Sequence, residues 1–101
     1  MTKEEFRKLA EQTLILDGAT GSNLMASGMP RGICTETWVI DHKDIIQNLQ
    51  RAYIKAGSQV IYAPTFGGNR LNLEKHGLAD RIEEINRTLV GYSKELAGNG
   101  V

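Results

Sequence analysis

Two short stretches of the chain combine polar side chains with glycines in a way that suits ligand binding. The first, ILDGATGSN, places Asp17 and Gly18 directly after an apolar run, and the second, APTFGGN, places Thr65 and Phe66 after another. A carboxylate can accept from a ligand ammonium, a threonine hydroxyl can donate or accept, and glycine lets the backbone approach a ligand closely. The two stretches therefore predict a small-molecule site, with a pair of ordinary turns as the alternative.

The apolar runs before these stretches have the composition of β-strands. Residues 13–18 (TLILDG) and 59–63 (QVIYA) are continuous apolar runs closed by turn residues, which is typical of strands buried on both faces in parallel sheets. Between them, the pattern predicts a helix over residues 41–56 that has Asp41 as its cap and stops at Gly57. The expected inner face of this helix is Ile45, Ile46, Leu49, Ala52, Tyr53 and Ala56.

Three further helices are expected. Thr2 and Glu5 have the spacing of a capping box, which places the start of a helix within residues 1–12. Apolar periodicity predicts a short helix over residues 69–77 and a longer one over residues 79–100. The short N-terminal helix needs a larger body to dock on, because helices of this length are marginal in isolation.

The order of elements predicts the fold class. The first half of residues 26–40 is expected as a loop because Gly28, Pro30 and Gly32 interrupt it, while Trp38 and Val39 in the second half need a surface to pack on. Val101 is expected to begin a third strand. Strands that alternate with helices predict an α/β fold with parallel strands, whose ligands bind at the carboxyl ends. Because two parallel strands leave an edge uncovered, we expect an incomplete domain that associates with further segments, or with itself, through the exposed sheet edge.

Composition excludes several classes of function. Twelve basic residues balance twelve acidic ones among the 101 residues, so neither nucleic acid nor an anionic membrane is an expected partner. No apolar stretch approaches the roughly 20 residues that cross a bilayer. The first residues, MTKEEFRKLAEQ, are charged and lack the apolar core of a signal peptide. We therefore expect a cytoplasmic protein.

The remaining candidates for chemistry favour structural roles. One cysteine allows neither an internal disulfide nor a zinc site of several cysteines, so Cys34 is expected as a small semi-buried apolar residue. His42 and His76 have no paired ligand at a useful spacing, and capping or solvated roles are expected for both. DGATGSN matches neither GxxxxGK[ST] nor GxGxxG, and its acid would repel a phosphate.

Beyond these local patterns, ILDGATGSNLMASG and YIKAGSQVIYAPTFGGNRLNLEKHGL resemble the homocysteine S-methyltransferase family. The family typically shows LDGaxGT, Y..AGad.i.TNTF and NR..L...G, which correspond here to residues 16–22, 53–66 and 69–77 in the same order and spacing. The likeness covers nearly all of the chain after the first helix. Within the family, the chain most resembles the N-terminal homocysteine-binding module of cobalamin-dependent methionine synthases.

The resemblance implies a fold and a reaction. The fold is a (β/α)₈ TIM-type barrel of about 300 residues, of which residues 1–101 would be an N-terminal portion and residues 1–12 a capping helix. The reaction is methyl transfer to the thiolate of homocysteine, held by a zinc ion with three cysteine ligands, to give methionine. The methyl donor would be methylcobalamin, methylfolate, betaine or S-methylmethionine, and cobalamin and methyltetrahydrofolate would belong to other modules.

The resemblance also assigns residues. Asp17 and Gly18 match the positions that help to hold the amino-acid end of homocysteine, and Thr65 and Phe66 match the strand tip beside them. Cys34 matches none of the zinc ligands, which lie further along the family's sequence, so this chain alone is expected to be inactive.

Three departures from the family pattern leave the substrate open. Pro64 stands where asparagine is usual, Gln50 where many members have histidine, and Ser22 where threonine is usual. The alternative to the enzyme is a non-catalytic α/β module that binds a small amino-acid-like ligand or a partner half-barrel.

Overall fold

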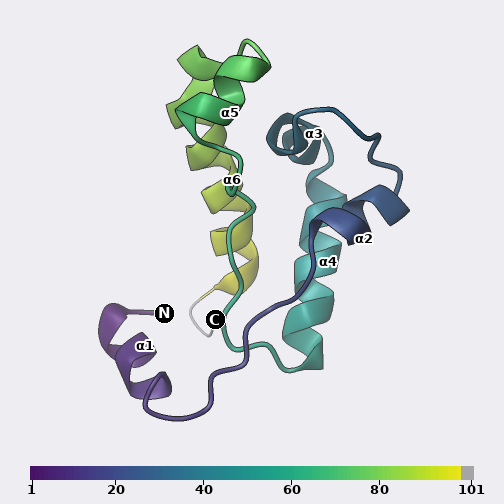
Figure 1. Cartoon of the computed structure of the whole chain (residues 1–101). Helices are drawn as coiled ribbons and strands as arrows, with labels where there is room; N and C mark the ends of the chain where they lie inside the picture. The colour runs from purple at the N-terminus through teal and green to yellow at the C-terminus, as the bar shows by residue number, and fades with distance from the viewer. Residues whose placement is uncertain (99–101) are drawn as a thin grey trace.

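The computed structural model describes residues 1–98, and within them helices are joined by extended segments (Figure 1). No strand is present among these residues. None of the described helices combines the length and the apolar character that a bilayer crossing requires. In chain order the elements are α1 (Lys3–Leu9), α2 (Gly21–Ala26), α3 (Thr35–Asp41), α4 (Lys43–Ala56), α5 (Arg70–Lys75), the 3-10 turn η1 (Ala79–Arg81) and α6 (Ile82–Ala97).

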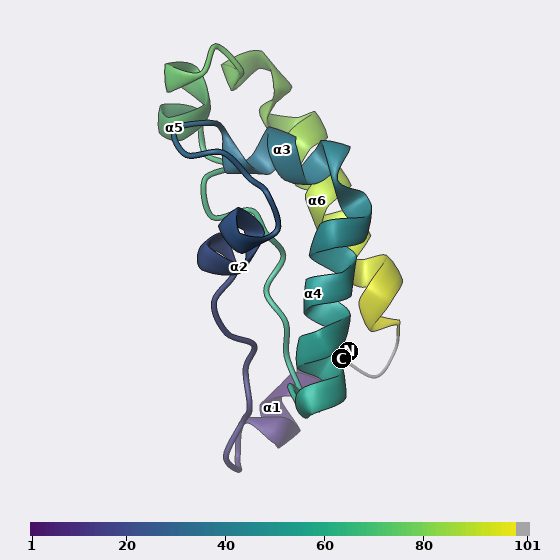
Figure 2. The ribbon, with the colours of Figure 1, turned by 90° about the vertical axis from the view of Figure 1, so that its right-hand side faces the viewer.

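The prediction of an α/β fold, as an N-terminal portion of a (β/α)₈ barrel, is wrong for the described residues. The two segments expected as strands run side by side (Figure 2), but they share one parallel bridge, between Leu16 and Val60. The amide of Gln59 donates to the carbonyl of Ile15 (2.7 Å) and that of Asp17 to the carbonyl of Val60 (3.0 Å). Apolar runs become strands when neighbouring strands pair with both of their edges, and within residues 1–98 each segment has a β-bridge only to the other.

The helix predicted over residues 41–56 is α4, whose end is confirmed and whose predicted start is wrong. It ends at Gly57, whose φ of 114° lies in the left-handed region that favours glycine. Asp41 does not cap α4 but closes α3, and His42 leaves helical geometry between the two (φ −128°, ψ 50°). The second half of residues 26–40 contains most of α3, a helix that the sequence pattern does not predict, and its Val39 is fully buried. Burial stabilises this helix despite its weak helix formers.

The two later helices lie where the periodicity predicts them. Helix α5 falls within residues 69–77, and Gly77 follows it with a φ of 70°. Helix α6 is preceded by η1 and has Gly98 as its C-cap. The predicted end at Gly100 and the predicted strand start at Val101 lie outside the described residues.

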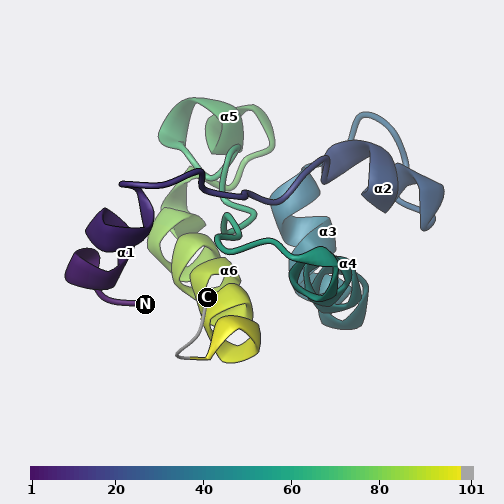
Figure 3. The same ribbon diagram turned by 90° about the horizontal axis from the view of Figure 1, so that it is seen from below.

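Helix α1 stands apart from the other helices (Figure 1), and Figure 3 shows it on the far side of α6 from α2. The expected capping box is present: the Thr2 hydroxyl accepts from the Glu5 amide (3.1 Å), and the Glu5 carboxylate accepts from the Thr2 amide (3.3 Å). No residue of α1 is buried, and Phe6 is exposed. The cap therefore stabilises α1 locally, while the core forms without this helix.

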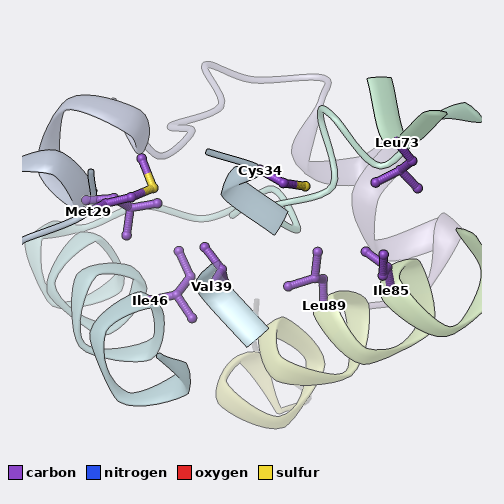
Figure 4. Close-up of a cluster of buried hydrophobic side chains, with 8 residues drawn as sticks. Met29, Cys34, Val39, Ile46, Leu73, Ile85 and Leu89 are labelled. Carbon is purple, nitrogen blue, oxygen red and sulfur yellow. The ribbon is translucent and has the colours of Figure 1, made fainter. Parts of the chain in front are cut away.

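One cluster of buried apolar side chains forms the core (Figure 4). Helices α3, α4 and α6 pack against one another, α2 packs against α4, and α5 packs against η1. Each fully buried leucine or isoleucine contributes about 1.5–3 kcal/mol to the free energy of unfolding. Cys34 belongs to this cluster, close to its predicted role as a semi-buried apolar residue. The members are Leu24, Met29, Cys34, Val39, Ile46, Leu73, Ile85 and Leu89.

Candidate functional site

A cavity of about 680 Å³ lies beside the stretch that follows the second extended segment. Its wall comes from residues 62–67, from the N-terminal ends of α2 and α3, and from α5. Its volume falls within the roughly 300–1,000 Å³ of small-molecule sites. A hollow of about 340 Å³ between α2 and α4 has no titratable side chain in its wall. The larger cavity is therefore the candidate site, and residues 64–68 (PTFGG) are called the tip below.

Two of the four predicted site residues line this cavity. Thr65 and Phe66 both belong to its wall, within the tip. The Phe66 ring is fully exposed, so it offers an apolar surface without a partner among the described residues. The Thr65 hydroxyl can donate or accept a hydrogen bond to a ligand. A contact of Thr65 and Phe66 with a ligand stays a prediction.

The other two predicted site residues, Asp17 and Gly18, do not line the cavity. Asp17 Oδ2 accepts from the Tyr62 amide (3.1 Å), so the carboxylate holds the second extended segment in place. A Cβ on Gly18 would lie 3.0 Å from the Tyr53 hydroxyl oxygen, and that hydroxyl donates to the carbonyl of Ala19 (2.7 Å). Both residues thus fix the route of the chain toward the cavity. A direct contact of Asp17 with a ligand stays a prediction.

Asparagine side chains hold the tip in position. Asn72 Nδ2 donates to the carbonyl of Gly67 (2.8 Å), and Asn86 Nδ2 donates to that of Gly68 (2.7 Å). A Cβ on Gly68 would lie 2.6 Å from Asn86 Oδ1, so a larger residue here would displace the Asn86 side chain that holds the tip. Sequence analysis singled out the glycines but missed both asparagines, because only the folded chain brings α5 and α6 to the tip.

Glu36 is the other residue of the site that sequence analysis missed. It lies in the first turn of α3, is only 4% exposed and lines the cavity. Its Oε1 accepts from Asn72 Nδ2 (3.5 Å) and from the Cys34 thiol (3.8 Å). A Cβ on Gly67 would lie 2.5 Å from the same oxygen. An acid in the first turn of a helix is ordinarily solvated, so the sequence carries no sign of this burial.

The departures at Gln50 and Pro64 have different positions relative to the cavity. Gln50 is buried; its Nε2 donates to the carbonyl of Tyr62 (3.0 Å), and its Oε1 accepts from the Ser93 hydroxyl (3.0 Å). It therefore joins α4 and α6 to the second extended segment, outside the cavity wall. Pro64 lies in the wall itself, where it supplies apolar surface and no backbone donor.

The described residues do not fit a zinc site. Within residues 1–98, no group of three histidine, cysteine or acidic side chains is placed to hold a metal ion. Cys34 is buried in the core cluster. His42 Nδ1 hydrogen-bonds the carbonyl of Trp38 (2.7 Å) and its ring stacks on the indole (3.8 Å between centroids), while His76 is the C-cap of α5.

Comparison with known proteins assigns the family. Residues 14–100 match the family model described as homocysteine S-methyltransferase. The match includes both extended segments and every helix that lines the cavity. The chain belongs to the homocysteine S-methyltransferase family, as the sequence resemblance predicts.

Individual relatives are similar over most of this chain but over a small part of their own length. The chain is 28% identical over 95 residues to a methionine synthase of Mycobacterium tuberculosis, covering 88% of this chain and 8% of that protein. It is 29% identical over 85 residues to the methionine synthase of Mycobacterium leprae, covering 78% and 7%. It is 29% identical over 90 residues to S-methylmethionine–homocysteine S-methyltransferase BHMT2 of Pongo abelii, covering 88% and 23%.

Proposed function

We propose that this chain supplies part of the homocysteine-binding site of a homocysteine S-methyltransferase that forms methionine. The observation that carries the proposal is that the cavity wall is built from the segments that match the family, with Thr65 and Phe66 inside it. The names of the relatives support methyl transfer to homocysteine at the level of the family. Since the chain spans 8% and 23% of two of these relatives, the activity of a whole protein is part of the proposal.

The cavity offers chemistry suited to a small amino acid with an apolar arm. Ile33 and Phe66 present exposed apolar surface for the carbon chain and thiol of homocysteine. The hydroxyls of Thr35 and Thr65 can donate to its carboxylate. Asp17 Oδ1 makes no hydrogen bond within the part of the chain that the structure describes, which leaves it as a further candidate for the ligand, with Gly18 beside it.

We propose that the zinc ion and the methyl donor bind outside this chain. The zinc ion that the resemblance implies would activate the homocysteine thiol, but the described residues do not fit it. We therefore propose that its ligands lie outside these 101 residues, and that cobalamin and methyltetrahydrofolate, where used, bind in other modules. The expected consequence is that this chain binds homocysteine without turnover.

The test is an NMR titration of the ¹⁵N-labelled chain with L-homocysteine under reducing conditions, with L-serine as the control ligand. We expect a dissociation constant on the order of 1 mM, about −4 kcal/mol, with the largest amide shifts around Thr65 and Phe66. Thr65→Val removes the hydroxyl at nearly constant volume, so affinity should fall roughly threefold to tenfold.

Thr88→Val makes the same change in α6, away from the cavity wall, and is expected to leave the affinity unchanged. Absence of shifts in the cavity wall, or equal shifts with L-serine, would contradict the proposal. A separate assay for methionine, run with zinc and a methyl donor, should show no product from this chain alone.

A further inference from the structure

The cavity contains a buried carboxylate whose hydrogen-bonding capacity is only partly used. Glu36 is 4% exposed, and within residues 1–98 both hydrogen bonds that its carboxylate accepts, from Cys34 and Asn72, go to Oε1. Oε2 has no hydrogen-bond partner within residues 1–98. In the same residues, no fully buried side-chain nitrogen or oxygen lacks a partner, so Oε2 is not fully buried, and Glu36 belongs to the cavity wall.

No cation of the described chain neutralises this carboxylate. The ion pairs among residues 1–98 join Lys43 to Glu95 and Arg81 to Glu84, and neither includes Glu36. The cavity wall contains no lysine or arginine, and Glu36 is its one acidic residue. The wall also includes His76, which forms no ion pair with Glu36 within residues 1–98. A buried carboxylate without a counter-charge is destabilising, and a cation supplied by a ligand would offset that cost.

The surroundings of Glu36 indicate what kind of cation would fit. Besides Glu36, the wall contains apolar side chains, hydroxyls and backbone, with Asn72 and His76 as its other polar side chains and with Ile33 and Phe66 as exposed apolar surface. One carboxylate oxygen beside apolar surface and hydroxyl donors suits a primary ammonium on a short carbon chain rather than a metal ion, which needs several oxygen or nitrogen ligands. An α-amino acid with a small apolar side chain has this chemistry.

We propose that Glu36 is a specificity-determining residue whose carboxylate binds the α-ammonium of the amino-acid ligand. The inference rests on the proposed function, which makes that ligand homocysteine, and it adds the residue that distinguishes an amino acid from a simple thiol acid. The ammonium donates to Oε2, while Asn72 and the Cys34 thiol hold Oε1 and so orient the group. Asp17 is less well placed for this contact, since its Oδ2 is already bonded to the Tyr62 amide and it lies outside the wall.

A purely structural role for Glu36 makes a different prediction. In that role the side chain serves only as an acceptor for Asn72 and Cys34, and glutamine, which keeps an acceptor oxygen at the same place, replaces it without loss of ligand discrimination. The experiment must therefore measure selectivity for the ammonium and not affinity or stability alone.

The test compares two ligands that differ by the amino group, L-homocysteine and 4-mercaptobutanoate, on three forms of the chain. The wild type should bind homocysteine on the order of tenfold more tightly than 4-mercaptobutanoate, as expected for one charge-assisted hydrogen bond. Glu36→Gln should remove most of this preference, mainly by weakening homocysteine binding. Glu74→Gln makes the same change of charge at an exposed position of α5 and should keep the preference.

A second measurement uses the wild type alone, in case Glu36→Gln does not fold. The side-chain ¹³Cδ resonance of Glu36 should shift on titration with homocysteine and not with 4-mercaptobutanoate. The inference is overturned if homocysteine binds in the cavity but Glu36→Gln keeps the preference, or if the ¹³Cδ resonance responds equally to both ligands; the proposed function survives either result. If homocysteine does not bind to the wild type, the proposed function fails and the inference fails with it.

Discussion

The helical body, meaning α3, α4 and α6, and the extended pair, residues 14–17 and 59–62, are stabilised in different ways. The helices satisfy their backbone groups internally and bury a shared apolar face. The extended pair has one bridge, and much of its apolar surface stays exposed, with Ile15 at 52% and Tyr62 at 64%.

Side-chain atoms supply much of the hydrogen bonding of the extended pair. Gln59 Oε1 accepts from the Ile15 amide (3.0 Å), the Ser58 hydroxyl donates to the carbonyl of Leu16 (3.1 Å), and Asp17 Oδ2 accepts from the Tyr62 amide. The comparison teaches that polar residues beside a candidate site can serve the backbone first. Asp17 illustrates this, because its type and position suggest a ligand contact while its observed partner is a main-chain amide.

The largest difference in the free energy of unfolding is expected between a buried apolar residue of the helical body and an exposed one of the extended pair. Leu89→Ala in α6 removes a fully buried side chain and should lower the free energy of unfolding by about 2–5 kcal/mol. Ile15→Ala in the extended pair removes a half-exposed side chain and should cost less than about 1 kcal/mol. Urea denaturation followed by circular dichroism measures both. Equal losses would show that the extended pair is as well packed as the helical body.

A smaller effect is expected at the joint between the two regions. Gln50→Leu leaves the carbonyl of Tyr62 and the hydroxyl of Ser93 without their partner and should cost about 1–3 kcal/mol. Because one of these bonds reaches the extended pair, amide hydrogen exchange of residues 59–62 should also become faster.

Gln47→Leu is the matched control for this joint, since Gln47 Nε2 donates to the carbonyl of Tyr92 (3.1 Å) within the helical body. It is expected to lower stability by a comparable amount but to leave hydrogen exchange in the extended pair in step with global unfolding. Selective faster exchange in both variants would mean that Gln50 has no special role as the joint.

The smallest effect is expected on the surface where η1 meets α6. Arg81 hydrogen-bonds Glu84 and lowers the pKa of that carboxyl, while Glu84 raises the pKa of the Arg81 guanidinium. A carboxyl whose pKa is lowered in the folded state stabilises it above the pKa of the unfolded chain, and this contribution is lost as pH falls through the folded pKa. Since both side chains are exposed to solvent, the effect of the pair on stability should be barely measurable.

Arg81→Gln should return the pKa of Glu84 toward its ordinary value, measured by NMR titration of its side-chain carboxyl. The midpoint of urea denaturation at neutral pH should stay nearly constant. A large loss of stability would show that exposed contacts of the helices contribute as much as buried ones. It would contradict the view that the helical body is stabilised mainly by burial.

The sequence by itself determined the family and most of the helices. The body of α4, its end at Gly57, the helix α5 before Gly77 and the apolar stripe of α6 follow from periodicity and local backbone geometry, because a helix forms its hydrogen bonds within one segment. The apolar run before Thr65 and Phe66 predicted that they lie together at its end, and both line the cavity, while their role in ligand binding stays a prediction.

Only the tertiary structure decided the state of the apolar runs and the identity of the buried polar groups. Whether an apolar run becomes a strand depends on neighbours from distant parts of a chain, and among residues 1–98 each extended segment has one. The helix α3, the burial of Glu36 and the contacts of Asn72 and Asn86 at the tip likewise depend on packing between segments far apart in sequence. Local sequence patterns do not predict such contacts. The type of a residue determines which groups it can hydrogen-bond, but the fold determines which of those groups lie close enough.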